Sequence, residues 1–150
     1  MADLSSLAWM DPVVLDRYPG LRAGQSDLFR RFLRARGAEF QRFAFRVPVG
    51  PVPGPSDAGA DFLDPVLEVV FRPRVTVLGQ SGPVFWAISI QQAANPSALG
   101  EVLMWREALP LEFPAIRSVV PAILTAQDNP NLRAAADAAG ALFLTVNSTP

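Results

Sequence analysis

The sequence contains no cysteine, no histidine and no lysine, so all thirteen of its basic residues are arginines. Without cysteine the chain has no disulfide, no thiolate nucleophile and no cysteine-ligated metal. Without histidine it lacks the commonest general base and the commonest metal ligand. A Walker-type phosphate loop and a Schiff base both need lysine, so these two chemistries are excluded as well. Any catalysis would have to use Asp, Glu, Ser, Thr, Tyr or Arg side chains.

A long apolar run is also missing. The longest uncharged stretch, residues 75–100, is interrupted by glycines and prolines, which is not the pattern of a membrane span. The first residues include an acid at Asp3, and no apolar signal-peptide core follows. We therefore expect a soluble, cytoplasmic protein with no membrane partner.

The composition is that of a chain that buries a core. Half of the 150 residues are apolar and 18% are charged, which predicts one ordinary globular domain. Residues 1–24 form a turn-rich lead-in, and residues 25–150 form a single domain. Residues 50–64, rich in Pro, Gly and Ser, are predicted to be a flexible loop within it.

Hydrophobic periodicity predicts eight elements in the order α-β-β-β-α-β-α-β. A helix capped by Ser26 ends at Gly37, and two further helices follow Asn95-Pro96 and Asn129-Pro130, each an N-cap followed by proline. The predicted strands are residues 43–49, 66–78, 84–91, 119–125 and 141–146, with a turn at 79–82 and an edge position at Pro48. The two final αβ units favour an α/β (α+β) mixed sheet with helices on both faces.

This order resembles the PD-(D/E)XK nuclease superfamily, which has the restriction-endonuclease-like fold. The closest stretch is 72–109, within a resemblance that covers roughly residues 26–147. In that family an Arg-x-Asp-type segment precedes a turn and an apolar strand carrying Glu-x-Lys. In the exonuclease-type branch, a helix with a Gln-x-x-x-Tyr pattern comes next. Here the strands are Arg-Val-Thr-Val-Leu and Trp-Ala-Ile-Ser-Ile-Gln, and the helix begins Ala-Leu-Gly-Glu.

The functional positions of that family are occupied by other residues in this chain. The metal-binding Asp aligns with Thr76, the Glu with Ser89 and the Lys with Gln91, while Gln and Tyr align with Glu101 and Trp105. Divalent metal ions need anionic oxygen ligands, which hydroxyl and amide groups do not supply. The resemblance therefore implies a nuclease-like scaffold with no catalytic residue, no metal and no other cofactor.

A cluster of arginines is the most informative surface feature. Residues 17–46 carry eight arginines against two acids. Within this segment the candidate nucleic-acid contacts are Arg30, Arg31, Arg34, Arg36 and Arg42. Guanidinium groups pair bidentately with phosphate, and several on one face give salt-dependent binding. The alternative interpretation is a solvated helix face in a chain that uses arginine in place of lysine.

Three functions remain open. The first is a catalytically inactive nuclease-like domain that binds nucleic acid or a protein partner as an assembly module. The second is a metal-dependent nuclease with a relocated acidic site built from Glu39, Asp64, Glu68 or Glu101; a metal site at Asp57, Asp61 and Asp64 competes with simple solvation of that loop. The third is a structural homo-oligomer, such as a homodimer, that buries exposed Phe or Trp side chains.

Overall fold

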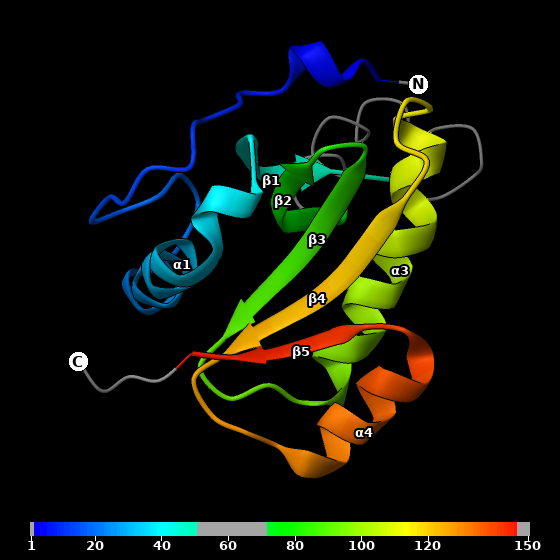
Figure 1. The fold of residues 1–150 in the computed structure, drawn as a ribbon. Helices are drawn as coiled ribbons and strands as arrows, with labels where there is room; N and C mark the ends of the chain where they lie inside the picture. The colour runs from blue at the N-terminus through cyan, green and yellow to red at the C-terminus, as the bar shows by residue number, and fades with distance from the viewer. Residues whose placement is uncertain (1, 51–71, 147–150) are drawn as a thin grey trace, which may run out of the picture.

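The computed structural model describes residues 2–50 and 72–146 (Figure 1). Its helices and strands follow the predicted order, α-β-β-β-α-β-α-β, so this prediction is confirmed. They are α1 (Ala23–Arg36), β1 (Arg42–Pro48), β2 (Arg74–Ser81), β3 (Val84–Gln91), α3 (Pro96–Glu112), β4 (Val119–Thr125), α4 (Pro130–Ala139) and β5 (Leu142–Thr145), with 3-10 turns η1 (Leu4–Ser6) and η2 (Gly37–Glu39). The fold is α+β.

The five strands form one mixed sheet in the order β1-β2-β3-β4-β5. The pairs β1–β2 and β2–β3 are antiparallel, whereas β3–β4 and β4–β5 are parallel and are joined through α3 and α4. Pro48 lies on the edge strand β1, as predicted. Pro121 is tolerated in β4 because pairing with β5 begins only at Ala122, so one side of the strand has no partner at the proline.

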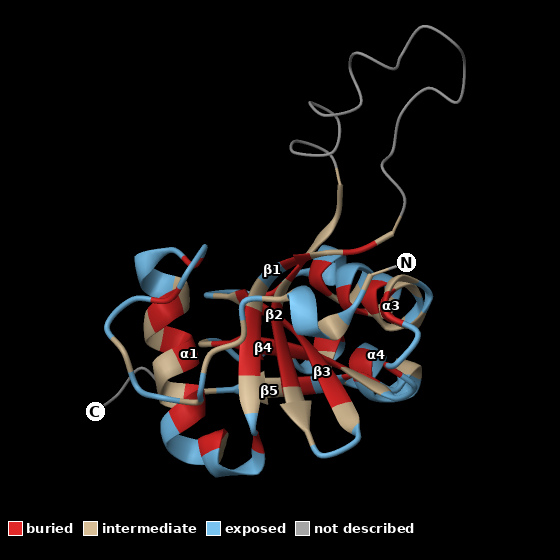
Figure 2. Ribbon diagram, turned by 90° about the horizontal axis from the view of Figure 1, so that it is seen from above, coloured by how far each residue is buried: buried red, intermediate tan, exposed pale blue. Residues whose placement is uncertain are grey.

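Helices cover both faces of the sheet, as predicted (Figure 2). On one face α1 packs Phe29 and Phe32 against the rings and aliphatic side chains of the strands. On the other face α3 and α4 bury Trp105 and Ala136 in a second core. None of the described helices combines the length and apolar character that spanning a bilayer requires.

The start of α1 differs from the prediction. The helix begins at Ala23 with Arg22 as the N-cap residue, one turn before the expected cap at Ser26. Ser26 is fully buried, and its hydroxyl accepts a hydrogen bond from the Tyr18 N–H at 3.2 Å. Its polar side chain therefore ties the lead-in to the helix. Tyr18 and Leu21 are buried in the α1-side core, so the last residues of the lead-in are part of the packed structure.

Two other boundaries also move. β2 extends to Ser81, and the turn is shortened to Gly82 and its neighbour, because Gly82 adopts the left-handed φ of +61° that a two-residue hairpin needs. The sequence pattern predicts that the helix after Asn95-Pro96 ends at Leu109, but α3 continues to Glu112. The predicted strand residues 66–71 and all but the first residue of the predicted flexible loop 50–64 lie outside the described part of the chain.

Candidate functional site

The sheet opens at one end, where β2 and β3 separate. Backbone pairing between these strands runs from the hairpin only as far as Val77 and Ile88. Beyond that point β2 pairs with β1 alone, and β3 continues along β4 to Gln91. The separated ends carry Thr76 on β2 and Ser89 on β3, so two hydroxyl groups flank the opening.

β1 changes direction opposite this opening. Arg46 has a left-handed φ of +56°, the one positive value among the described non-glycine residues. Phe43, Phe45, Val47 and Val49 alternate along the sequence, and an unbroken strand would place them on a single face. In the structure the two phenylalanines pack with the α1-side core, whereas the two valines pack with the α3-side core. The predicted strand is present as β1, and the left-handed residue reverses the alternation of its side chains after Phe45.

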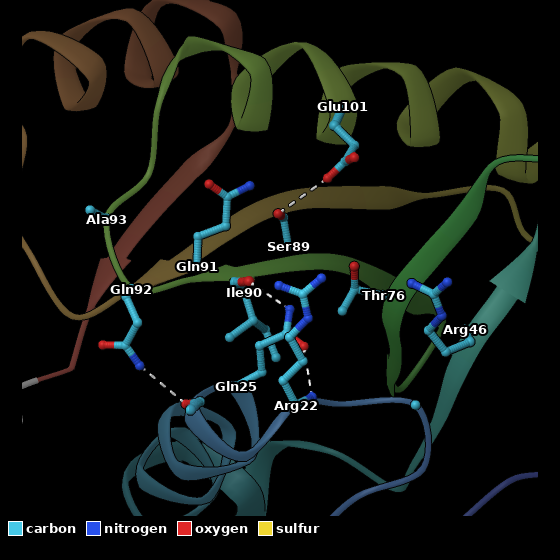
Figure 3. A pocket seen from close by; sticks show the side chains of 12 residues that line it. Arg22, Gln25, Arg46, Thr76, Ser89, Ile90, Gln91, Gln92, Ala93 and Glu101 are labelled. Atoms are coloured by element: carbon cyan, nitrogen blue, oxygen red, sulfur yellow. Dashed lines mark hydrogen bonds between the residues drawn. The ribbon is translucent and has the colours of Figure 1, made fainter.

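A pocket of about 770 Å³ occupies the opening (Figure 3). Figure 3 shows Arg22 and Arg46 extending from the start of α1 and from β1 toward the strands, while Glu101 points down from α3. The lining is mainly polar and consists of Gly20, Arg22, Gly24, Gln25, Arg46, Thr76, Ser89, Ile90, Gln91, Gln92, Ala93 and Glu101. With two arginines and one glutamate, the side chains of the pocket carry a formal charge of +1 when the glutamate is ionised.

Glu101 is the only carboxylate among the described residues that line the pocket. Its Oε1 accepts a hydrogen bond from the buried Ser89 hydroxyl at 3.4 Å, a weak contact. Partial desolvation raises the pKa of Glu101, and the Ser89 hydrogen bond and the positive charge of Arg46 oppose that rise. The carboxylate is therefore more easily protonated than an ordinary glutamate.

The start of α1 forms the opposite wall. The Gln25 side chain accepts from the Arg22 backbone N–H at 2.9 Å and donates to the Ile90 carbonyl at 3.1 Å. Gln92 donates to the Gly24 carbonyl at 3.3 Å. These contacts attach the helix to the end of β3, which leaves the Arg22 guanidinium directed at the pocket (Figure 3).

Four of the five positions implied by the family resemblance meet in this pocket: Thr76, Ser89, Gln91 and Glu101. The fifth, Trp105, is 1% exposed and belongs to the α3-side core. Residues far apart in the sequence are thus gathered at one end of the sheet, although most of them are uncharged.

The predicted arginine face lies further along α1 and beyond it, and most of its members already have partners. Arg30 and Arg31 form salt bridges with Asp27 at 2.6 and 3.0 Å. Arg36 pairs with Glu39 at 2.7 Å and lies over the Trp86 ring. The remaining two are Arg42, which stacks 3.9 Å above the Trp9 ring and bonds Gln80, and Arg34, which is exposed and has no hydrogen bond or salt bridge to any described residue.

The structure does not gather the alternative acidic residues. Glu39 is paired with Arg36 at the far end of α1, about 20 Å from the pocket end at 1.5 Å per residue. Asp57, Asp61, Asp64 and Glu68 lie outside the described residues. Within the described ranges, no group of three Asp or Glu side chains is placed to hold a metal ion.

Sequence reasoning did not single out Arg22, Arg46, Gln25 or Gln92 as site residues. Arg46 gave one usable signal, a charge inside an apolar alternating strand. The left-handed backbone that brings it into the pocket has no signature in the sequence, because it occurs at an arginine and not at a glycine. Arg22 was counted in the basic segment, but its position depended on where α1 begins.

Comparisons with known proteins identify no relative. No protein-family model matches the sequence, and no curated protein or solved structure is similar to it at a significant level.

Proposed function

We propose that this chain is a catalytically inactive, nuclease-like domain that binds nucleic acid as a binding or assembly module. The observation that carries the proposal is the composition of the pocket. Thr76, Ser89, Gln91 and Glu101 line it together, yet they contribute one carboxylate where a nuclease metal site needs at least two anionic ligands. Arg22 and Arg46 in the same pocket favour binding of a phosphate group over its hydrolysis.

Fluorescence anisotropy with labelled duplex and single-stranded DNA tests this function. We expect binding that weakens steeply with salt, because phosphate contacts release counterions. Binding should be the same with and without Mg²⁺, and neither Mg²⁺ nor Mn²⁺ should produce cleavage at high protein concentration. Absence of binding at low salt would overturn the proposal. Metal-dependent cleavage that Glu101→Ala abolishes would replace it with the relocated-site nuclease.

Exposed aliphatic side chains favour the homo-oligomer as a second candidate. Met104 and Leu111, seven residues apart on α3, are 49% and 77% exposed. No phenylalanine or tryptophan of the described residues is among the exposed large side chains, in contrast to the prediction for this candidate. Sedimentation equilibrium distinguishes the two: a monomer at micromolar concentration rejects self-association, and a dimer dissociated by Leu111→Glu supports it.

A further inference from the structure

The pocket supports a narrower assignment than nucleic-acid binding in general. We infer that the pocket binds a phosphate monoester between Arg22 and Arg46, and this inference rests on the proposed function. A phosphate monoester is the form of phosphate found at the end of a nucleic-acid strand. The two guanidinium groups come from different elements and face one cavity. Neither donates a hydrogen bond or forms a salt bridge with a described residue, in contrast to Arg30, Arg31 and Arg36.

An unusual backbone conformation presents Arg46 to the pocket. Its left-handed φ costs on the order of 1–3 kcal/mol in a non-glycine residue, and such conformations cluster at binding sites. Gly20 leaves room for the Arg46 stem: a Cβ at Gly20 would lie 3.0 Å from Arg46 Cδ and would overlap Cγ. The absence of a side chain at Gly20 is thus what leaves space for the Arg46 side chain beside the pocket.

The uncharged part of the lining suits phosphate and sugar more than a base. Amide and hydroxyl groups come from Gln25, Gln91, Gln92, Thr76 and Ser89. Among the described residues that line the pocket none is aromatic, so a nucleobase would find no ring to stack on. The cavity of about 770 Å³ is large enough for a phosphate with its sugar.

Charge favours a monoester over a diester. A phosphate monoester carries between about 1.5 and 2 negative charges near neutral pH, which two guanidinium groups neutralise. An internal diester carries one negative charge, which is less than the +2 of the two guanidinium groups when Glu101 is protonated and equals the net +1 when Glu101 is ionised. The preference for a monoester therefore belongs to the protonated state of Glu101.

Glu101 makes the binding dependent on pH. Arg46 on β1 and Ser89 on β3 face its carboxylate, and Arg22 lies across the same pocket. An ionised Glu101 repels the phosphate dianion, whereas the protonated acid can donate a hydrogen bond to it. Because desolvation already raises the pKa of Glu101, the bound phosphate would favour proton uptake at this residue.

Inorganic phosphate is the first probe, added to the full chain at constant ionic strength and followed by nuclear magnetic resonance of N–H groups. We expect shifts at the pocket and at the Nε–H groups of Arg22 and Arg46. Arg22→Gln and Arg46→Gln should each weaken binding about ten- to a hundredfold, the effect of losing a charged hydrogen-bond donor. Arg46→Lys should recover only part of it, because ammonium cannot bind bidentately. Arg117→Gln, at an exposed arginine that does not line the pocket and has no hydrogen bond or salt bridge to a described residue, is the matched control and should leave phosphate binding unchanged.

Glu101→Gln provides a test in which phosphate binding should become tighter, in contrast to the two arginine variants. At pH 8 it should tighten phosphate binding about tenfold relative to the wild type, and the advantage should shrink as the pH falls toward 5. Comparing the two proteins at each pH cancels the titration of phosphate itself. Shifts confined to residues outside the pocket, or wild-type affinity in both Arg22→Gln and Arg46→Gln, would overturn the assignment.

Oligonucleotides of one sequence then separate this inference from the proposed function. We expect tighter binding of a strand with a terminal phosphate than of the same strand with a hydroxyl end, and loss of that difference in Arg46→Gln. Equal binding of both strands, lost in Arg34→Gln, would reject the end-binding pocket and leave nucleic-acid binding intact. Phosphate bound in the pocket with no gain from an attached strand would support a monoester site and reject the nucleic-acid role.

Discussion

Replacing Gly20 by alanine tests whether the neighbouring glycine holds Arg46 in the pocket. Gly20 has a left-handed φ of +73°, where alanine costs about 1–2 kcal/mol. The added Cβ would also overlap Arg46 Cγ, which lies too near the backbone to move without a change of χ1. Forcing that side chain from its rotamer costs on the order of 0.5–1.5 kcal/mol. We therefore expect Gly20→Ala to lower the free energy of unfolding by about 1.5–3.5 kcal/mol.

A double-mutant cycle separates the two contributions. In Arg46→Ala only Cβ remains, 3.6 Å from the position of the new methyl group, which is an ordinary contact. Gly20→Ala should then cost only the backbone part, leaving a coupling energy of about 0.5–1.5 kcal/mol. Gly82→Ala is the matched control, because Gly82 has a φ of +61° and nothing within 4 Å of the added Cβ. Urea denaturation followed by circular dichroism measures all five proteins. A coupling energy of zero would refute the proposed contact.

Three further predictions concern packing and charge. Gly79→Ala should lower the free energy of unfolding by about 1–3 kcal/mol, measured by urea denaturation. The added Cβ would lie 2.7 Å from a ring carbon of Phe43 and 3.0 Å from one of Phe40. An unchanged stability would mean that the two rings move aside freely. Trp105→Ala should lower the free energy of unfolding by about 3–5 kcal/mol. Phosphate affinity should be unchanged in the folded fraction, because Trp105 is buried in the α3-side core and does not line the pocket; altered affinity would place it in the site. Glu101→Gln should stabilise the protein at pH values above 4.5, the ordinary pKa of glutamate. Because the pKa of Glu101 is raised in the folded state, folding loses stability as this group ionises with rising pH. Thermal melts at pH 4 and pH 8 check this, and a variant less stable than the wild type at pH 8 would contradict the desolvation argument.

The order of elements was predictable because its signals are local. Asn95 and Asn129 each precede a proline, and their side chains accept hydrogen bonds from Ala98 and Leu132 at 3.3 and 3.1 Å, as an N-cap pattern predicts. Ser26 carries an equally good capping side chain but is used differently. Its hydroxyl accepts a hydrogen bond from Tyr18, eight positions earlier in the lead-in. This is a tertiary contact that no periodic pattern in the sequence predicts.

The pocket was only partly predictable for a related reason. The family resemblance brought Thr76, Ser89, Gln91 and Glu101 to attention, and the structure places all four in one cavity. The reversal at Arg46 was missed because a rule of strict alternation assumes an unbroken strand conformation. A left-handed residue in mid-strand depends on what packs against it, and here that neighbour is Gly20, more than twenty residues away.

The position of an uncompensated charge decides where an anion binds, and a count of charges along the sequence does not give that position. Arg30, Arg31 and Arg36 raise the arginine count of residues 17–46, but each already has a carboxylate partner among its helical neighbours. A phosphate bound there would have to compete with Asp27 and Glu39 for the same donors. In the pocket, by contrast, none of the described acidic residues is hydrogen-bonded to Arg22 or Arg46, and the one described carboxylate that lines the pocket is Glu101, whose pKa is raised. Arg22 and Arg46 thus bring two guanidinium groups to the pocket beside the separated ends of β2 and β3, which is why we propose the phosphate site there and not along α1.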